Sequence, residues 1–142
     1  MKLRLRIMQS FEDIIKEAQK AAQKIEMIVI EEMEDKATEC VTSIQAETPV
    51  KTGALQRSIT HDNPKKKEDK YIVTCGSSLE YAQSVEEGHI QEVGKYVPAI
   101  GKKLVKSFVP GKHMIQNNVD LYQEYMDESI KERIEKEVWN EL

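Results

Sequence analysis

The stretch that decides the fold is "TPVKTGALQRSI", residues 48–59, because it ends a long helical pattern and reverses the chain. Thr48 precedes Pro49, and a proline ring pushes the residue before it out of helical geometry. The helix must therefore finish by Glu47. Gly53 can adopt a positive φ that other residues resist, which lets the chain turn back. The stretch thus predicts a fixed corner between a helix and the structure that follows it.

A long helix is predicted upstream of this corner. Ser10 and Asp13 resemble a capping box at its start, and the apolar pattern runs to about Ala46. At ~1.5 Å per residue such a helix would be about 50 Å long, which is long for a small domain. Either it packs in part on another chain, or it breaks near the acidic cluster "EEMED", residues 31–35. Before the helix, the strict alternation of residues 2–7 predicts a half-buried edge strand. The apolar stripe comprises Phe11, Ile14, Ile15, Ala18, Ala22, Ile25, Val29, Met33, Ala37, Cys40, Val41 and Ile44.

A β-hairpin and a short helix are predicted after the corner. Leu55–His61 and Tyr71–Cys75 have the composition of two strands, and the polar stretch "DNPKKKED" between them is expected to form the hairpin tip. Ser77 or Ser78 can cap the short helix, and Gly88 is expected to end it.

A long loop and a final helix complete the chain. Residues 90–112 contain three glycines and two prolines without a clear period, which favours a loop with at most one strand, at Leu104–Val109. From His113 a second apolar stripe at helical spacing is predicted to run to the end of the chain. The order of these elements predicts an α+β fold in which long N- and C-terminal helices pack on a small antiparallel β-sheet.

Length and composition favour one soluble domain spanning residues 1–142. Two cysteines, Cys40 and Cys75, are too few for a disulfide scaffold, and the N-terminus lacks the apolar core of a signal peptide. No apolar run approaches the roughly 20 residues of a membrane span. We therefore expect a protein made in a reducing cytoplasm, without a membrane partner.

The net charge of −4 conceals an uneven distribution. Residues 93–119 contain five lysines and no acid, whereas residues 122–142 contain seven acids and three basic residues. Only Tyr96 and Phe108 interleave the lysines, too few to indicate base stacking. An acidic partner, including the acidic C-terminal helix of a neighbouring copy, fits at least as well as nucleic acid. The five lysines are Lys95, Lys102, Lys103, Lys106 and Lys112.

The sequence contains no pattern that indicates catalysis. His61, His89 and His113 lie far apart and do not have the spacing of metal ligands. No phosphate-binding loop and no nucleophile elbow are present. We therefore predict no catalytic residue, no metal site and no cofactor, and expect that the protein is not an enzyme.

Three motifs resemble, in order and spacing, the signature of a family of small neck proteins of tailed bacteriophages. This gp-ten-like or tail-component family is related to the tail-completion protein Z of phage lambda. The motifs are the corner, the segment "YAQSVEEGH" and the stretch "FVPGKHM". The matching residues are Thr48, Pro49, Val50, Thr52, Gly53, Leu55 and Ser58, then Tyr81, Ala82, Val85, Glu86 and Gly88, then Pro110, Gly111 and Met114.

The resemblance implies a structural role without catalysis or cofactor. Copies would form a ring of six in the virion neck, assembled in the host cytoplasm between adjacent neck and tail proteins. A tail-terminator or head-closure (stopper) ring protein is the alternative within the same assembly, and a dimeric helical regulator that binds nucleic acid is the alternative outside it. Because the long helix exceeds its domain, Ile25 and Val29 are expected at the subunit interface, with the five lysines on a protein partner or on DNA in the channel.

Overall fold

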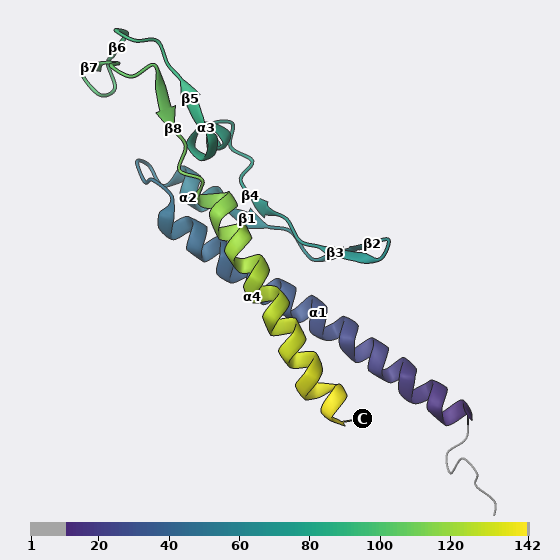
Figure 1. The fold of residues 1–142 in the computed structure, drawn as a ribbon. Coiled ribbons are helices and arrows are strands. Elements are labelled where there is room, and N and C mark those ends of the chain that lie inside the picture. The colour runs from purple at the N-terminus through teal and green to yellow at the C-terminus, as the bar shows by residue number, and fades with distance from the viewer. Residues whose placement is uncertain (1–10, 142) are drawn as a thin grey trace, which may run out of the picture.

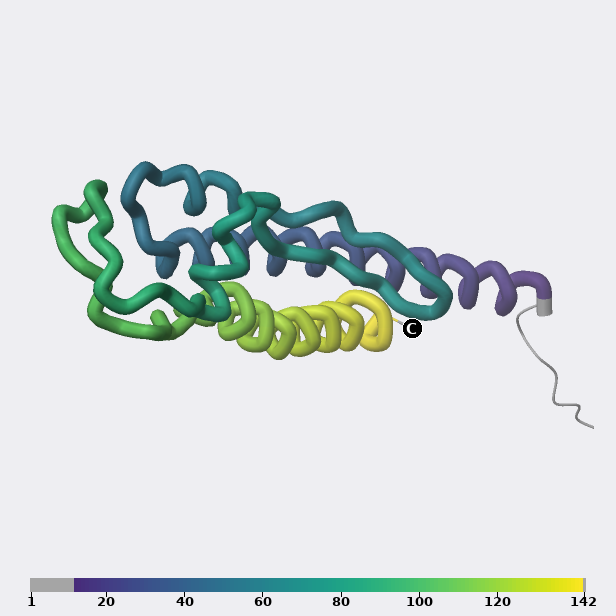
Figure 2. The backbone as a smooth tube through the Cα atoms, turned by 90° about the horizontal axis from the view of Figure 1, so that it is seen from above, coloured from purple at the N-terminus to yellow at the C-terminus, as the bar shows by residue number. Residues whose placement is uncertain are grey.

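The computed structural model describes residues 11–141, and two long helices dominate it (Figure 1). Helix α1 is Phe11–Glu47 and helix α4 is Met114–Glu137, followed by the short 3₁₀ helix η1, Trp139–Glu141. The helices lie side by side, and the N-terminal end of α1 extends past the end of α4 (Figure 2). The strand predicted for residues 2–7 and the cap at Ser10 lie outside the described residues.

Helix α1 continues without a break through its acidic cluster. Arg133 of α4 donates from Nη1 to Glu31 at 3.0 Å and to Glu32 at 3.1 Å. These bonds offset the repulsion among the acids of the cluster, and hydrogen bonds to Glu137 and then Glu31 raise the pKa of the Arg133 guanidinium. Of the two outcomes that the sequence left open for this helix, a break near residues 31–35 is wrong.

The corner at residues 48–53 is confirmed. Helix α1 ends at Glu47, and the buried Thr48 hydroxyl donates to the Ile44 carbonyl at 2.7 Å. Gly53 has a φ of +80°, the left-handed conformation that glycine adopts most readily. The chain therefore leaves the helix through a turn that both a hydrogen bond and a glycine stabilise.

The strand predicted for Leu55–His61 is wrong in its first half. Helix α2, Ala54–Ser58, follows the corner, and only β1, Thr60–His61, is extended. Leu55 and Ile59, four residues apart, are both buried, so helical spacing brings both side chains into the core. The Thr52 hydroxyl accepts the Ala54 N–H at 3.3 Å and supports the first turn.

The hairpin is present but is divided into two ladders, both antiparallel. Strand β1 pairs with β4, Cys75–Gly76, and β2, Lys65–Lys67, pairs with β3, Lys70–Ile72. The predicted Tyr71–Cys75 strand is interrupted because the Asp62 carboxylate accepts the Thr74 N–H at 2.7 Å. The predicted polar tip is narrower than expected, since β2 occupies part of it.

Helix α3, Ala82–Glu87, ends at Gly88 as predicted, with a φ of +91° at this glycine. The predicted serine cap is wrong. The Ser77 hydroxyl accepts the Leu79 N–H at 3.1 Å in the turn before the helix, and Tyr81 occupies the cap position.

Residues 88–110 form a β-ribbon instead of the predicted loop, and we call this ribbon the arm. Strand β5, Gly88–Ile90, pairs with β8, Phe108–Pro110, and β6, Tyr96–Val97, pairs with β7, Lys102–Lys103. Between the two ladders, the Leu104 N–H donates to the Lys95 carbonyl at 2.8 Å. The strand predicted at Leu104–Val109 overlaps only β8.

The core lies at the end of the helix pair from which the arm emerges. Its buried residues come from the C-terminal half of α1, from α2 and the residue after it, from α3, and from the start of α4. Long helices and four small antiparallel ladders confirm the α+β class. The buried residues of this cluster are Cys40, Ile44, Leu55, Ile59, Ala82 and Met114.

Candidate assembly surfaces: the motif junction and the basic arm

The three sequence motifs meet at the core end of the helix pair, and we call this region the motif junction, residues 48–58, 81–88 and 110–114. Five of its members are buried, three from the first motif and one from each of the others. These motif residues hold the junction together, while others remain at its surface. The five buried residues are Thr48, Gly53, Leu55, Ala82 and Met114.

Glu86 fixes the start of α4 from outside that helix. Its carboxylate accepts the Ile115 N–H through both oxygens at 2.9 Å and the Gln116 N–H at 3.2 Å. Helix α4 has no side-chain cap of its own, because His113 at the cap position makes no such bond. A carboxylate at a helix N-terminus satisfies free N–H groups and complements the helix dipole. Glu86 therefore joins α3 to α4.

Gly88 and Gly111 pack backbone against backbone where the arm leaves and re-enters the junction. A Cβ on Gly88 would lie 2.8 Å from the Gly111 nitrogen, and a Cβ on Gly111 would overlap the backbone of Glu86 and Glu87. The His113 N–H donates to the Glu86 carbonyl at 3.0 Å alongside this contact. The base of the arm is therefore a close contact that only glycines permit.

The surface of the junction offers a shallow hollow of about 300 Å³ lined by residues of the first two motifs, among them Pro49, Leu55 and Tyr81. Val50 and Tyr81 are exposed beside or within it. Ser58 lies deeper and shares a 2.6 Å hydrogen bond with Ser77. Lys51 is the one charged residue among the described residues that line this hollow.

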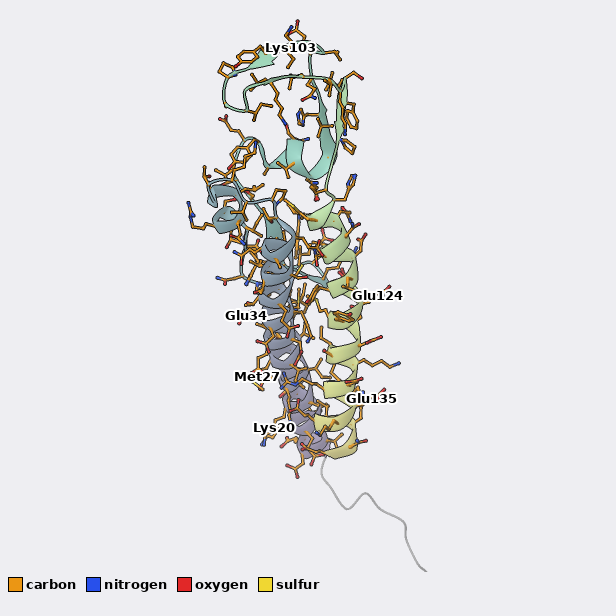
Figure 3. All side chains as sticks on the ribbon, turned by 90° about the vertical axis from the view of Figure 1, so that its left-hand side faces the viewer. Lys20, Met27, Glu34, Lys103, Glu124 and Glu135 are labelled. Carbon is orange, nitrogen blue, oxygen red and sulfur yellow. The ribbon has the colours of Figure 1, made fainter. Side chains whose placement is uncertain are left out.

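The arm carries four of the five lysines of the predicted cluster, and Lys112 follows at its base. All five lysines are exposed, and none of them forms an ion pair with a carboxylate of residues 11–141. Lys103 lies at the end of the molecule farthest from the acidic end of α4, where Glu135 points away from α1 (Figure 3). Basic side chains are therefore concentrated at the arm end of the molecule, and acidic side chains at the C-terminal end of α4.

The arm also exposes apolar side chains, of which only Tyr96 and Phe108 were noted from the sequence. Ile90 is 85% exposed and Val105 is 80% exposed, although both lie in or beside paired backbone. An isolated two-stranded ribbon with no packed face is at best marginally stable in water. A partner that covers these side chains would stabilise it. The other exposed apolar residues of the arm are Val93, Tyr96, Ile100 and Phe108.

Ile25 and Val29, predicted at a subunit interface, are half-buried within the chain. Val29 lines a hollow between α1, β3 and α4, so part of the long apolar stripe is covered intramolecularly. Further toward the start of α1, the Lys24 ammonium donates to the Glu137 carbonyl at 2.8 Å, and Glu17 and Ala21 line a hollow with Val138. Residues 12–20 are exposed throughout.

The candidate metal ligands and nucleophiles of the described residues lie apart or are held in the fold. No cluster of three potential metal ligands occurs in residues 11–141, and no helix there is long and apolar enough to cross a membrane. Burial, and then the neighbouring Cys75 thiol, raises the pKa of Cys40 to about 12, which makes it a poor nucleophile at neutral pH. His61 is held by hydrogen bonds to Thr38 and Asp62.

Residues 12–88, just over half of the chain, match the family model described as "Bacteriophage HK97-gp10, putative tail-component". The chain belongs to this HK97-gp10-like family. It is therefore a bacteriophage tail component, a structural protein of the virion. The matched region includes the first two motifs and ends at Gly88, where the arm begins. No curated protein and no solved structure matches the chain.

Proposed function

We propose that this HK97-gp10-like protein forms a ring, of six copies, in the neck of the virion and completes the tail for joining to the DNA-filled head. The relationship to the tail-completion protein Z of phage lambda is part of the proposal. The protein acts as a spacer and adaptor between adjacent neck and tail proteins, without catalysis.

The arm is the observation that carries this proposal. It extends from the core end of the helix pair, away from the rest of the chain (Figures 1 and 2). It exposes apolar side chains together with lysines that form no ion pair in residues 11–141. In a monomer such a surface leaves apolar groups in water and like charges close together. In an assembly a neighbouring subunit can cover the apolar groups and neutralise the lysines.

The motif junction supports the same role. Glu86 and the contact between Gly88 and Gly111 fix the direction in which the arm leaves the helices. In a closed ring any error in this direction repeats at every subunit, so a rigid base favours closure. Gly53 at +80° similarly fixes the exit from α1.

A phage with this gene deleted, supplied with the wild-type protein or with none, tests the proposal by electron microscopy. Without the protein we expect DNA-filled heads and finished tails that stay apart, and addition of the purified protein should join them. Tails of uncontrolled length would instead indicate a tail terminator, and heads that lose DNA would indicate a head-closure protein. Normal virions in the absence of the protein would contradict all three roles.

A nucleic-acid-binding regulator is the candidate outside the virion. The lysines of the arm and those of β2 could contact phosphate, but the described surface offers few aromatic side chains beside them. Sequence-specific, salt-dependent binding of DNA by the purified protein would favour the regulator. Contact of Lys102, Lys103 and Lys106 with channel DNA in the ring would be weak and independent of sequence.

A further inference from the structure

A continuous groove runs along α4 on the side of the β2–β3 hairpin. It consists of three hollows of about 300, 300 and 450 Å³. The first and second share Met126, and the second and third share Ile130. The groove begins beside Cys40 and Ile115 and ends at Trp139. At ~1.5 Å per helical residue, the part of α4 and η1 that lines it is about 36 Å long.

The floor of the groove is apolar and its surroundings are acidic. Trp139 is 54% exposed in it, and Ile130 is half-buried. Its charged lining residues are Asp127 and Glu135 beside Lys36 and Lys131, but residues 122–141 as a whole contain seven acids against three basic residues. On the adjoining helix, residues 26–35 contain five acids and no basic residue, and Arg133 is already bound to acids of both helices. A ligand with apolar and cationic side chains would therefore fit this groove.

Building on the proposed ring, we infer that the groove receives the arm of a second copy of this chain. The arm carries exposed apolar groups that can cover the apolar floor, and lysines without an ion pair in residues 11–141 that can neutralise the excess of acids on this part of α4. The charges and the apolar surfaces of the arm and the groove are therefore complementary.

The arm of the same chain cannot fill the groove. It leaves the helix pair at the core end and points away from the C-terminal end of α4 (Figures 1 and 2). A contact between an arm and the groove of another copy joins two different surfaces, so it is heterologous and generates a ring or an open filament. The close contact between Gly88 and Gly111 fixes the angle between the arm and the helix pair, and a fixed angle favours a closed ring over an open filament.

A photo-crosslinker at Tyr96, an exposed aromatic residue of β6, tests this contact directly. The protein with benzoylphenylalanine at this position is mixed with ¹⁵N-labelled wild-type chain, irradiated over a concentration series, and also irradiated in assembled virions. We expect adducts between copies at residues that line the groove, such as Ile130 or Trp139. The control carries benzoylphenylalanine at Tyr81, in the motif junction, and should form no adduct with residues of the groove.

The inference is overturned if the Tyr96 adducts lie outside the groove, join only residues of one chain, or are absent from both the concentrated protein and the virions. If groove adducts form between copies but the gene deletion yields normal virions, the contact between arm and groove is supported and the proposed function is contradicted. If the deletion leaves heads and tails separate but no groove adducts form, the proposed function is supported and the contact is contradicted.

A matched pair of variants on α4 and η1 provides an independent measurement. Trp139→Glu places a carboxylate in the groove, whereas Leu121→Glu places one on an exposed position of α4 that lines none of the three hollows. Trp139→Glu is expected to weaken self-association about tenfold or more by analytical ultracentrifugation, and Leu121→Glu to leave it nearly unchanged. Equal effects of the two variants would also overturn the inference.

Discussion

The Glu86 carboxylate of α3 accepts the backbone N–H of Ile115 through both oxygens at 2.9 Å, so a residue 29 positions upstream caps α4. Between these residues the chain runs out along the arm and back. The bond therefore closes the base of the arm and, together with the contact between Gly88 and Gly111, couples the direction of the arm to the helix pair. Three of the family motif residues thus serve one mechanical purpose.

Glu86→Ala is expected to lower the free energy of unfolding by about 1–2 kcal/mol, because the first N–H groups of α4 lose their acceptor and the dipole its counter-charge. Glu86→Gln should cost less, since its amide oxygen can still accept one bond. Urea unfolding measures both. Glu87→Ala is the control, because Glu87 is exposed and its carboxylate accepts a hydrogen bond from Gln83 of the same helix. A loss for Glu87→Ala as large as that for Glu86→Ala would contradict the capping role.

Gly111→Ala is expected to destabilise the protein by about 1–3 kcal/mol, because the new methyl group would overlap the backbone of α3 and force the arm to shift. Gly76→Ala is the matched control. A Cβ at Gly76 would have no atom within 4 Å, so we expect a change within about 0.5 kcal/mol. Thermal unfolding measures the stability of the two variants. Equal melting temperatures would show that the close contact between Gly88 and Gly111 is not required for stability.

Gly53→Val is expected to cost about 1 kcal/mol or more, since a β-branched residue resists the φ of +80° at the corner. A Cβ here would also meet the Arg57 guanidinium at 2.6 Å, but that flexible end can move away. The backbone is therefore the cause, and Gly53→Asn should cost less because asparagine tolerates this region. Equal losses for the two variants, measured by chemical unfolding, would show that the side chain and not the backbone angle decides.

The helices could be predicted from the sequence because their signals are local. Pro49 stops α1 and the recurring apolar residues define both stripes. Leu55 and Ile59 were less informative, since a spacing of four residues with polar neighbours also fits a short strand. Their burial against Cys40 and Ile44 favours the helix, and that contact is a tertiary effect.

The arm and the capping of α4 by Glu86 could not be predicted, because the residues that pair in them are far apart in the sequence. Strands of two or three residues, interrupted by Gly94 and Gly101, carry too weak a periodicity to be recognised. The pairing of Gly88 with Pro110 depends on how the chain returns to the junction. Glu86 was identified only through its motif, and nothing near it in the sequence indicates Ile115 as its partner.

Cys40 is expected to make the protein sensitive to alkali. Its thiol ionises at about pH 12 in the fold and has an ordinary pKa of 9.0, so the unfolded chain releases this proton first. The contribution of the Cys40 thiol to the free energy of unfolding is fully present below pH 9. It falls as pH rises toward 12, by about 1.4 kcal/mol per pH unit. Cys40→Ala removes this contribution, so its unfolding free energy should fall less steeply over the same range. Parallel pH profiles for the wild type and the variant would contradict the assignment.

Reversal of three arm charges, Lys102→Glu, Lys103→Glu and Lys106→Glu, is expected to reduce head–tail joining in vitro, because these lysines form no ion pair in residues 11–141 and an acidic partner would neutralise them. The defect should be largest at low ionic strength, where charges act over about 30 Å, and smaller near 1 M salt, where the range is about 3 Å. The same triple reversal at Lys65, Lys66 and Lys67 of β2 is the matched control, since it changes the net charge equally on a surface outside the arm. Joining is measured by counting complete particles in electron micrographs. If both triple variants impair joining equally, only overall charge matters, and if neither does, the arm makes no electrostatic contribution to assembly.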